Sequence, residues 1–274
     1  MIDLHLHTTA SDGRSTPEAL IAEAASAGLR VISVTDHDTL AALPEARAAA
    51  HAAGLDLVPG IEVTAVEDAR DLHILGYFVD ERHEPLAAFL VEQRADRRRR
   101  VVEILDRLSN LGVPLEKDQV FGRESRGRAI GRPAVARALV AAGHAADIND
   151  AFARYLGHDG SAYVPRRGAR PEDVIALIRR AGGLASIAHP GKSERDDRLP
   201  ALVAHGLGGI EAFHPDHTDA DIARYVALAQ RLGLAVTGGS DYHGPGSGRS
   251  AALGHVTLPE TRYADLLERA GRQT

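Results

Sequence analysis

The sequence predicts an α/β fold, a distorted (β/α)7 barrel with a helical insertion. Short apolar segments alternate with helical stretches, which is typical of parallel strands joined by crossover helices. Seven such apolar segments occur in 274 residues, enough for a small barrel. The alternation stops between about residues 81 and 165, where the pattern is helical. We therefore expect a barrel formed by 1–80 and 166–274, and a helical insertion or lid formed by 81–165.

The barrel elements can be assigned in order along the chain. The expected strands lie at 2–6, 31–35, 55–63, 73–79, 185–188, 209–213 and 235–237. The expected barrel helices lie at 16–27, 40–53, 171–181 and 220–232. Thr16 followed by Pro17 is a typical helix start, because an N-cap residue precedes proline in the first turn.

The insertion is expected to contain helices at 86–111, 132–142 and 147–156, with a glycine- and arginine-rich loop at 122–131. The first helix carries an arginine run at 97–100. We interpret this run as a solvated helix face rather than an RNA-binding track, because runs of like charge usually face water.

Composition is ordinary for a soluble globular protein, with 44% apolar and 26% charged residues. The net charge of −6 does not favour nucleic acid as an electrostatic partner of the whole molecule. The absence of cysteine excludes disulfides, thiolate metal sites and a cysteine nucleophile. No segment has the character of a signal peptide or a membrane span, and none indicates an obligate protein partner. A cytoplasmic location is expected.

Histidines and carboxylates gather at the ends of the expected strands. His5 and His7 alternate with apolar residues and therefore share one face of the first strand. Asp241 and His243 repeat this spacing after the last strand. Further members of this pattern are Asp12, Asp36, His37, Asp38, Glu62 and His189. His73 is a further candidate, although it opens its expected strand instead of following one. Because strand ends converge on one face of a βα barrel, the pattern predicts a metal-binding active site there. Asp36 and Asp38 can also be helix caps or outer partners of the ligands.

The same segments resemble the PHP (polymerase and histidinol phosphatase) domain family. The matching segments are, in family order, HLHTTASDG, TDHDT, PGIE, DLHILGY, IAHPG and SDYHG. The resemblance implies a distorted (β/α)7 barrel that holds two or three divalent metal ions. It implies that one metal is held by His5, His7, Glu62 and Asp241. A second would share Glu62 as a bridge and add His73 and His189, and a third would be held by Asp12, His37 and His243. Imidazole and carboxylate ligands suit Mn²⁺, Zn²⁺ or Fe²⁺, of which we expect Mn²⁺.

Two more segments resemble one subgroup of that family, the enzymes that dephosphorylate nucleoside 3′,5′-bisphosphates and trim RNA from its 5′ end. These segments are GRP at 131–133, followed by ARAL at 136–139, and EAFHPDH at 211–217. The resemblance implies that Arg132 lies over the site and that His217 faces the substrate. Lys192 follows the strand end at His189 and is expected to bind phosphate. Three further candidates for this pocket are Arg123, Arg126 and Arg128, but for at least two of them we favour a solvated loop.

We therefore expect a phosphoric ester hydrolase in which a metal-activated water attacks phosphorus. Glu62, Asp241 and His217 are the candidate catalytic residues. Arg132, Lys192 and His217 are the candidate substrate-binding residues. The expected substrate is a nucleoside 3′,5′-bisphosphate, with 5′-to-3′ trimming of short RNA as an extension.

Three alternatives stay open. The first is a phosphatase acting on histidinol phosphate or another small molecule, and the second is a metal-dependent amidohydrolase. The third is a non-catalytic PHP module that binds a partner. Neither Lys117 nor Lys192 lies in an expected strand, which disfavours an amidohydrolase with a carbamylated bridging lysine.

Overall fold

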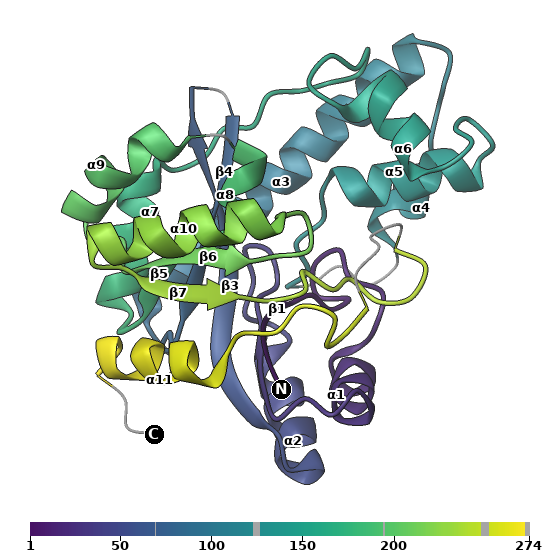
Figure 1. Cartoon of the computed structure of the whole chain (residues 1–274). Helices are drawn as coiled ribbons and strands as arrows, with labels where there is room; N and C mark the ends of the chain where they lie inside the picture. Colours follow the sequence, from purple (N-terminus) through teal and green to yellow (C-terminus); the bar gives the residue numbers. More distant parts are fainter. Residues whose placement is uncertain (69, 123–126, 194, 248–251, 272–274) are drawn as a thin grey trace.

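The computed structural model describes residues 1–68, 70–122, 127–193, 195–247 and 252–271. In this part of the chain seven strands form one sheet, and neighbours in the sheet follow chain order from β1 to β7. The strands are β1 (Ile2–Leu6), β2 (Val31–Val34), β3 (Asp56–Glu67), β4 (Arg70–Tyr77), β5 (Leu184–Ile187), β6 (Gly209–Phe213) and β7 (Ala235–Gly238). A parallel bridge between Leu6 and Tyr242 joins the two edges. The sheet is therefore nearly closed into a barrel, and the predicted fold class is confirmed (Figure 1).

The strands β3 and β4 depart from the parallel arrangement that the sequence predicts. They pair antiparallel from Gly60 opposite Tyr77 to Glu67 opposite Arg70, and β4 also pairs antiparallel with β5. The physical reason is the short connection, since a parallel crossover requires a dozen or more residues and these strands are almost contiguous. The hairpin places His73 opposite Thr64, two residues from Glu62.

Helices surround the barrel. They are α1 (Pro17–Ser26), α2 (Leu43–Ala53), α7 (Pro171–Arg180), α8 (Pro190–Ser193), α9 (Leu199–Ala204), α10 (Asp219–Leu232) and α11 (Glu260–Arg269), with a 3₁₀ turn, η2 (Asp196–Arg198). The side chain of Thr16 accepts a hydrogen bond from the Ala19 backbone N–H, and Pro17 follows it, so α1 begins where the sequence predicts. The main core lies between the strands and the helices α7 and α10 that pack against them, and it includes Ile61, Ile74 and Ile178.

The segment between β4 and α7 is helical and projects from the barrel at the upper right of Figure 1. It contains α3 (Glu84–Asn110), α4 (Lys117–Phe121), α5 (Arg132–Ala141), α6 (Ile148–Ala151) and a π-helical continuation, η1 (Phe152–Leu156). Leu86 and Leu90 at the start of α3 pack into the barrel core. From Val101 to Val164 the buried residues form a separate hydrophobic cluster. The long helix α3 therefore joins the barrel to a second helical core.

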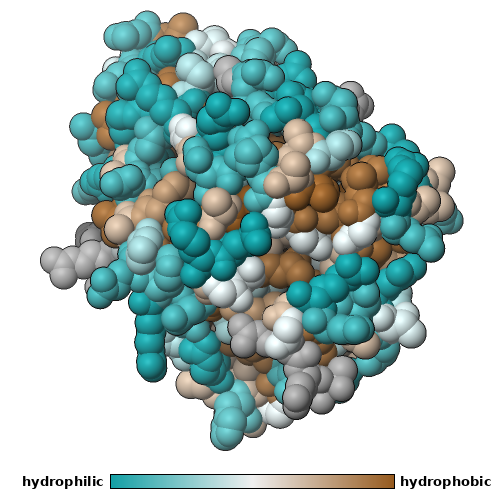
Figure 2. Space-filling view, turned by 90° about the vertical axis from the view of Figure 1, so that its left-hand side faces the viewer, coloured by the Kyte–Doolittle hydropathy of each residue, from teal (hydrophilic) through white to brown (hydrophobic). Residues whose placement is uncertain are grey.

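The surface is mostly hydrophilic. On the face shown in Figure 2, hydrophilic residues cover most of the area and hydrophobic ones gather in a smaller region right of centre. In the described part of the chain, the exposed large apolar side chains are Met1, Val91 and Leu111. None of the described helices combines the length and the apolar character needed to span a bilayer.

Candidate metal centre

The nine residues expected to bind metal lie in one cluster at one end of the sheet. His5 lies in β1, Glu62 in β3 and His73 in β4, and the others follow strand ends. Those following strand ends are His7, Asp12, His37, His189, Asp241 and His243. Most of the nine are buried, and the side chain of His73 has the largest exposed fraction, 23%. The structure thus brings every predicted ligand together, and the division among individual metals stays a prediction.

Glu62 is the centre of this cluster, since five imidazoles surround its carboxylate. Glu62 Oε1 lies 2.7 Å from His73 Nδ1 and 3.1 Å from His189 Nε2. Glu62 Oε2 lies 2.9 Å from His37 Nδ1, 3.3 Å from His7 Nε2 and 3.5 Å from His5 Nε2. The two carboxylate oxygens therefore face different sets of imidazoles. This is the arrangement that a carboxylate bridging two metals requires.

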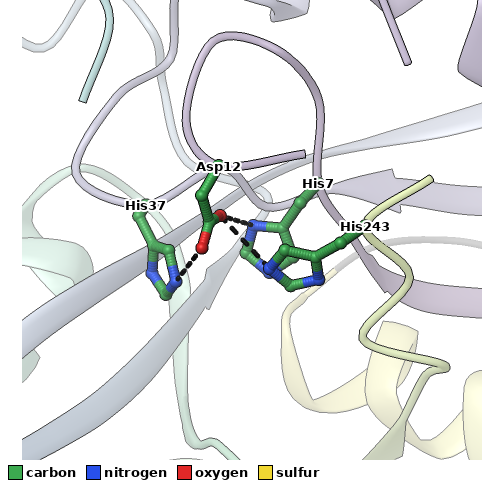
Figure 3. A group of neighbouring side chains, drawn as sticks. All are labelled: His7, Asp12, His37 and His243. Carbon is green, nitrogen blue, oxygen red and sulfur yellow. Dashed lines mark ion pairs between the residues drawn. The ribbon is translucent and has the colours of Figure 1, made fainter. Parts of the chain in front are cut away.

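Asp12 is the centre of a second group, in which the imidazoles of His7, His37 and His243 surround its carboxylate (Figure 3). His243 Nε2 lies 3.1 Å from Asp12 Oδ1, and His37 Nε2 lies 3.9 Å from Asp12 Oδ2. His7 Nδ1 also lies 3.9 Å from Asp12 Oδ1. One ligand atom from each of these four residues falls within 4.8 Å of the others, which is compact enough to hold one ion. His7 therefore lies beside the three residues predicted for the third metal as well as beside Glu62.

The buried polar atoms of this cluster fit a cation. Among the described residues, His5 Nε2, His7 Nε2, His37 Nδ1 and Glu62 Oε2 are buried and have no hydrogen-bond partner. Buried polar atoms in proteins are nearly always satisfied, so a group of unsatisfied acceptors at one point requires an explanation. Imidazole and carboxylate donors around one point are ligands for Mn²⁺, Zn²⁺ or Fe²⁺. The residues present therefore fit the metal ions that the sequence predicts.

The pKa shifts in the cluster show that its imidazoles cannot all carry protons. Burial disfavours protonated His7, but the neighbouring carboxylates of Asp241 and Glu62, each 3.3 Å from its Nε2, raise its pKa to about 9. For His37 and His189 burial dominates and lowers the pKa to about 4. Burial acts to raise the pKa of Glu62, yet the surrounding imidazoles hold it well below its usual range. The cluster thus offers neutral imidazole nitrogens beside ionised carboxylates.

Buried carboxylates outside the nine predicted ligands hold those ligands in place. Glu211 Oε1 lies 2.9 Å from His5 Nδ1, and Glu211 Oε2 accepts the His189 backbone N–H at 2.7 Å. Asp36 accepts the Thr8 backbone N–H at 2.8 Å and so fixes the loop that carries Asp12. The sequence prediction missed Glu211. Its signal is a charged residue inside the otherwise apolar strand β6.

His214 is a second residue that the prediction missed. It is 2% exposed, its Nε2 lies 3.4 Å from Asp241 Oδ2, and its ring centroid lies 5.3 Å from that of His189. The Asp216 backbone N–H donates to His214 Nδ1 at 3.1 Å, which favours the tautomer with the proton on Nε2. His214 can therefore donate to Asp241. The signal was present, because His214 follows the end of β6 as His189 follows that of β5.

The backbone at the site adopts conformations that L-residues rarely use. Asp38, His189 and Asp241 have φ angles of 50°, 28° and 50°. Such conformations are unfavourable for residues other than glycine and collect at functional sites.

The close approach of the chain after β7 to β1 requires a glycine. A β-carbon at Gly239 would lie 2.4 Å from the backbone nitrogen of His5.

The three predicted substrate-binding residues have different surroundings. Lys192 Nζ lies 2.7 Å from Asp216 and 3.5 Å from Asp241 Oδ2, at the edge of the cluster. Arg132 Nη2 lies 3.2 Å from Asp71 Oδ2. His217 is buried: its Nδ1 lies 2.8 Å from the Ala212 carbonyl oxygen, and the Gly191 backbone N–H donates to its Nε2 at 3.2 Å. His217 therefore supports the loop before Lys192, and its direct contact with substrate stays a prediction.

The other arginines predicted near the substrate lie in the loop at 122–131. Arg128 Nε donates to the carbonyl oxygen of Thr9 at 2.7 Å, which ties this loop to the barrel. Arg123 and Arg126 fall outside the described residues.

The interpretation of 97–100 as a solvated helix face is wrong for two of its four arginines. Arg97 and Arg100 are 6% and 4% exposed, whereas Arg98 is exposed and Arg99 pairs with acidic neighbours on α3. The reason is helical periodicity, which places residues three apart on one face. Arg97 donates to the carboxylate of Asp38, beside His37, and to Thr64 Oγ1 at 3.0 Å. The insertion is therefore anchored next to the candidate ligands.

Comparison with known proteins identifies the family that this chain matches. Residues 3–180 match the family model of the PHP domain. The phosphoribosyl 1,2-cyclic phosphate 1,2-diphosphodiesterase of Eggerthella lenta is 40% identical over 88% of this chain and 94% of its own. The 5′-3′ exoribonuclease Rnm of Escherichia coli is 36% identical over 89% of this chain and 85% of its own. The 3′,5′-nucleoside bisphosphate phosphatase of Chromobacterium violaceum is 34% identical over 93% of this chain and 91% of its own.

Solved structures agree with the fold. A crystal structure described as a metal-dependent phosphoesterase, from Bifidobacterium adolescentis, matches with a TM-score of 0.90 and 36% identity, over 98% of this chain and 96% of that one. A structure of an amidohydrolase from Chromobacterium violaceum with bound sulfate matches with a TM-score of 0.88 and 32% identity, over 98% of this chain and 96% of that one. The barrel and its insertion are therefore present together in both.

Proposed function

Because the chain belongs to the PHP domain family and is a metal-dependent phosphoesterase, we propose that it dephosphorylates nucleotides carrying both 3′ and 5′ phosphates. Trimming of short RNA from its 5′ end is an extension of the same chemistry. The observation that carries this proposal is the position of three arginines of the insertion, the buried Arg97 and Arg100 and the half-buried Arg132, beside the imidazole and carboxylate cluster. A relative named as a bisphosphate phosphatase and another named as a 5′-3′ exoribonuclease support it.

We propose a division of labour between two parts of the chain. The barrel, 1–80 and 166–274, would hold the metals, and the insertion, 81–165, would bind the rest of the substrate. The proposed ligands are the nine predicted residues, and the proposed ions are two or three Mn²⁺ in a cytoplasmic enzyme. When bound, such metals lower the pKa of a water molecule to produce a nucleophile and stabilise charge on the phosphoryl oxygens.

The chain's own residues would orient the reacting phosphate. Lys192 lies beside the cluster, and its ammonium, 3.5 Å from Asp241 Oδ2, is placed to donate to an oxygen of a phosphoryl group bound there. Asp216, which is 54% exposed, holds Lys192 in this position. His217 fixes the backbone of Gly191 one residue before Lys192. These contacts place a fixed positive charge at the mouth of the site, where phosphoryl transfer develops negative charge.

Two other functions are separable from this one. The 40% identity to a phosphoribosyl cyclic phosphate diphosphodiesterase makes that cyclic phosphate the second candidate substrate. An amidohydrolase bridging two metals by a carbamylated lysine is disfavoured, because Lys117 lies in α4 and Lys192 in α8 rather than in a strand.

Phosphate release across a substrate panel tests the proposed function. We would measure kcat/KM with Mn²⁺ for adenosine 3′,5′-bisphosphate, AMP, histidinol phosphate and phosphoribosyl 1,2-cyclic phosphate. A preference for the bisphosphate over AMP of about tenfold or more, or roughly 1.4 kcal/mol from the second phosphate, is expected. A higher kcat/KM for AMP or histidinol phosphate would overturn the substrate assignment. A higher value for the cyclic phosphate would assign the second candidate function instead.

A further inference from the structure

Three arginines surround one carboxylate where the insertion meets the barrel. We call these side chains the Asp71 cluster, which consists of Asp71, Arg100, Arg132 and Arg166. Asp71 Oδ2 lies 3.2 Å from Arg132 Nη2 and 3.8 Å from Arg100 Nη1. Asp71 Oδ1 lies 3.7 Å from Arg166 Nε. Three guanidinium groups from three different segments therefore converge on a single carboxylate.

The neighbouring Asp38 does not neutralise the excess positive charge. Arg166 Nη1 lies 3.4 Å from Asp38 Oδ2, but Arg97 already pairs with that same oxygen. Among the described residues of this region, four guanidinium groups thus face two carboxylates. Arg100 and Arg166 are only 4% and 9% exposed, so water does not compensate them. Burial and neighbouring guanidinium groups lower the pKa of both to about 10.

Two buried nitrogen atoms of the cluster also have unsatisfied hydrogen-bond donors. Arg100 Nη2 and Arg166 Nε have no hydrogen-bond acceptor in the described part of the chain. A guanidinium group presents five donors in a planar fork that matches phosphate oxygens. Arg100 uses its Nε to hold the carbonyl oxygen of Val164 at 2.8 Å, which aims the rest of the fork at Asp71. The cluster therefore has donors to spare for an anion with more oxygens than a carboxylate.

A cavity gives a ligand access to Asp71 and Arg132, the two members of the cluster that line it. Asp71 and Arg132 line a cavity of about 370 Å³ together with Tyr163. The guanidinium groups of Arg100 and Arg132 lie 5.7 and 6.0 Å from the centroid of the Tyr163 ring. Asp71 also lines an adjacent cavity of about 190 Å³ with Lys192, whose ammonium reaches the candidate metal centre. Asp71 thus lies between the two cavities.

The distance from the metal centre suits a nucleotide. Asp71 and His73 are two residues apart on one face of β4, a separation of about 7 Å along a strand. In a nucleoside 3′,5′-bisphosphate only C3′, C4′ and C5′ lie between the two ester oxygens. One phosphate at the metal centre therefore leaves the other within reach of the Asp71 cluster.

We propose that the three arginines of the Asp71 cluster bind the remote phosphate of the substrate. Asp71 pairs with these arginines until the phosphate displaces its carboxylate. A phosphate dianion carries more charge and more acceptor oxygens than one carboxylate, so it meets both the charge excess and the unfilled donors. This inference rests on the proposed function, because it requires a substrate with a second phosphate. It adds Arg100 and Arg166 to Arg132 as phosphate-binding residues and gives Asp71 the role of an internal competitor.

Steady-state kinetics of Arg100→Lys test the subsite, because lysine keeps the charge but removes the fork of donors. The matched control is Arg99→Lys, the next position on α3, whose guanidinium pairs with Asp96 and Glu103 instead. The substrates are adenosine 3′,5′-bisphosphate and p-nitrophenyl phosphate, which has no second phosphate. We expect Arg100→Lys to lose at least tenfold more kcat/KM on the bisphosphate, mainly through KM. Arg99→Lys should show no such difference, and equal losses of Arg100→Lys on both substrates would overturn the proposal.

The thermal stability of Asp71→Asn gives a readout that does not depend on activity. The melting temperature is compared in sodium phosphate and in sodium chloride of equal ionic strength. Because the competing carboxylate is gone, phosphate should raise the Tm of Asp71→Asn by at least about 3 °C more than that of the wild type. Equal increments would refute the displacement of Asp71. If the wild type cleaves p-nitrophenyl phosphate but not the bisphosphate, the proposed function fails and the thermal comparison alone decides whether the cluster binds phosphate.

Discussion

Substitution of Glu211 by glutamine tests how the candidate ligands are held in place. Glu211 supports two of them, through His5 Nδ1 at 2.9 Å and the His189 backbone N–H at 2.7 Å. Glutamine keeps the shape of the side chain but offers one acceptor oxygen instead of two. Either His5 or His189 therefore loses its acceptor and faces an amide NH₂ group.

The size of the effect follows from these two contacts. A hydrogen bond to a charged group contributes about 1.5–3 kcal/mol. Loss of a residue that orients a metal-binding histidine typically weakens metal binding by about 10- to 100-fold, or roughly 1.4–2.8 kcal/mol. We therefore expect the Kd for Mn²⁺ of Glu211→Gln to rise about 10- to 100-fold, with most of the activity recovered at saturating Mn²⁺.

Competition with a fluorescent chelator measures this affinity. The control is Ser186→Ala, which removes a buried hydrogen bond at 2.9 Å to Thr237 and touches none of the nine candidate ligands. The control should lose about 1 kcal/mol of unfolding free energy and keep its Mn²⁺ affinity. Wild-type Mn²⁺ affinity in Glu211→Gln would refute the argument that Glu211 positions the ligands.

Three further predictions follow from the same geometry. Glu62→Gln should lower kcat by more than about 100-fold, the largest loss typical of residues that only orient metal ligands, because the Glu62 carboxylate is the centre of the cluster. Kinetics at saturating Mn²⁺ would show this loss, and an unchanged kcat would exclude a bridging role for Glu62. Burial acts to raise the pKa of Asp38, but Arg97 and Arg166 hold it below its usual range, so the stability from these ion pairs is present above about pH 4 and is lost as the pH falls through the lowered pKa. Asp38→Asn should therefore cost about 3–5 kcal/mol at pH 7 and progressively less in acid, as urea unfolding at a series of pH values would reveal; a pH-independent difference would contradict this. Removal of metal by a chelator should lower the Tm by about 5–10 °C, reversibly on addition of Mn²⁺, and a constant Tm would contradict metal binding by the folded cluster.

The barrel could be predicted because its strands are short apolar segments with helices between them. The antiparallel hairpin of β3 and β4 could not, since both strands extend into polar residues such as Glu67 and Arg70. Those residues pair by backbone hydrogen bonds, which leave no apolar pattern in the sequence. Chain direction within a sheet depends on connection length, and the expected strand ends made that connection appear longer than it is.

Most candidate ligands could be predicted because strand ends converge on one face of a barrel, whatever the details of the loops. His73 could not be placed in this way, because it opens its expected strand, and its role as a ligand was implied only by the resemblance to the PHP family. Arg97 and Arg100 could not, since four consecutive arginines carry no periodicity that distinguishes a buried face from an exposed one. Glu211 was missed for a different reason. A carboxylate in the middle of a strand is recognised as an orienting group only when the imidazole it contacts is known, and that contact joins residues 206 positions apart.

The central claim is that the cluster around Glu62 holds the metals on which hydrolysis depends. Elemental analysis of protein purified without chelator, combined with its rate of phosphoester hydrolysis, tests it most directly. We expect two or three divalent ions per chain in the wild type, and loss of both metal and activity in Glu62→Ala. Full activity in protein that contains no divalent metal, or an unchanged metal content in Glu62→Ala, would contradict the account.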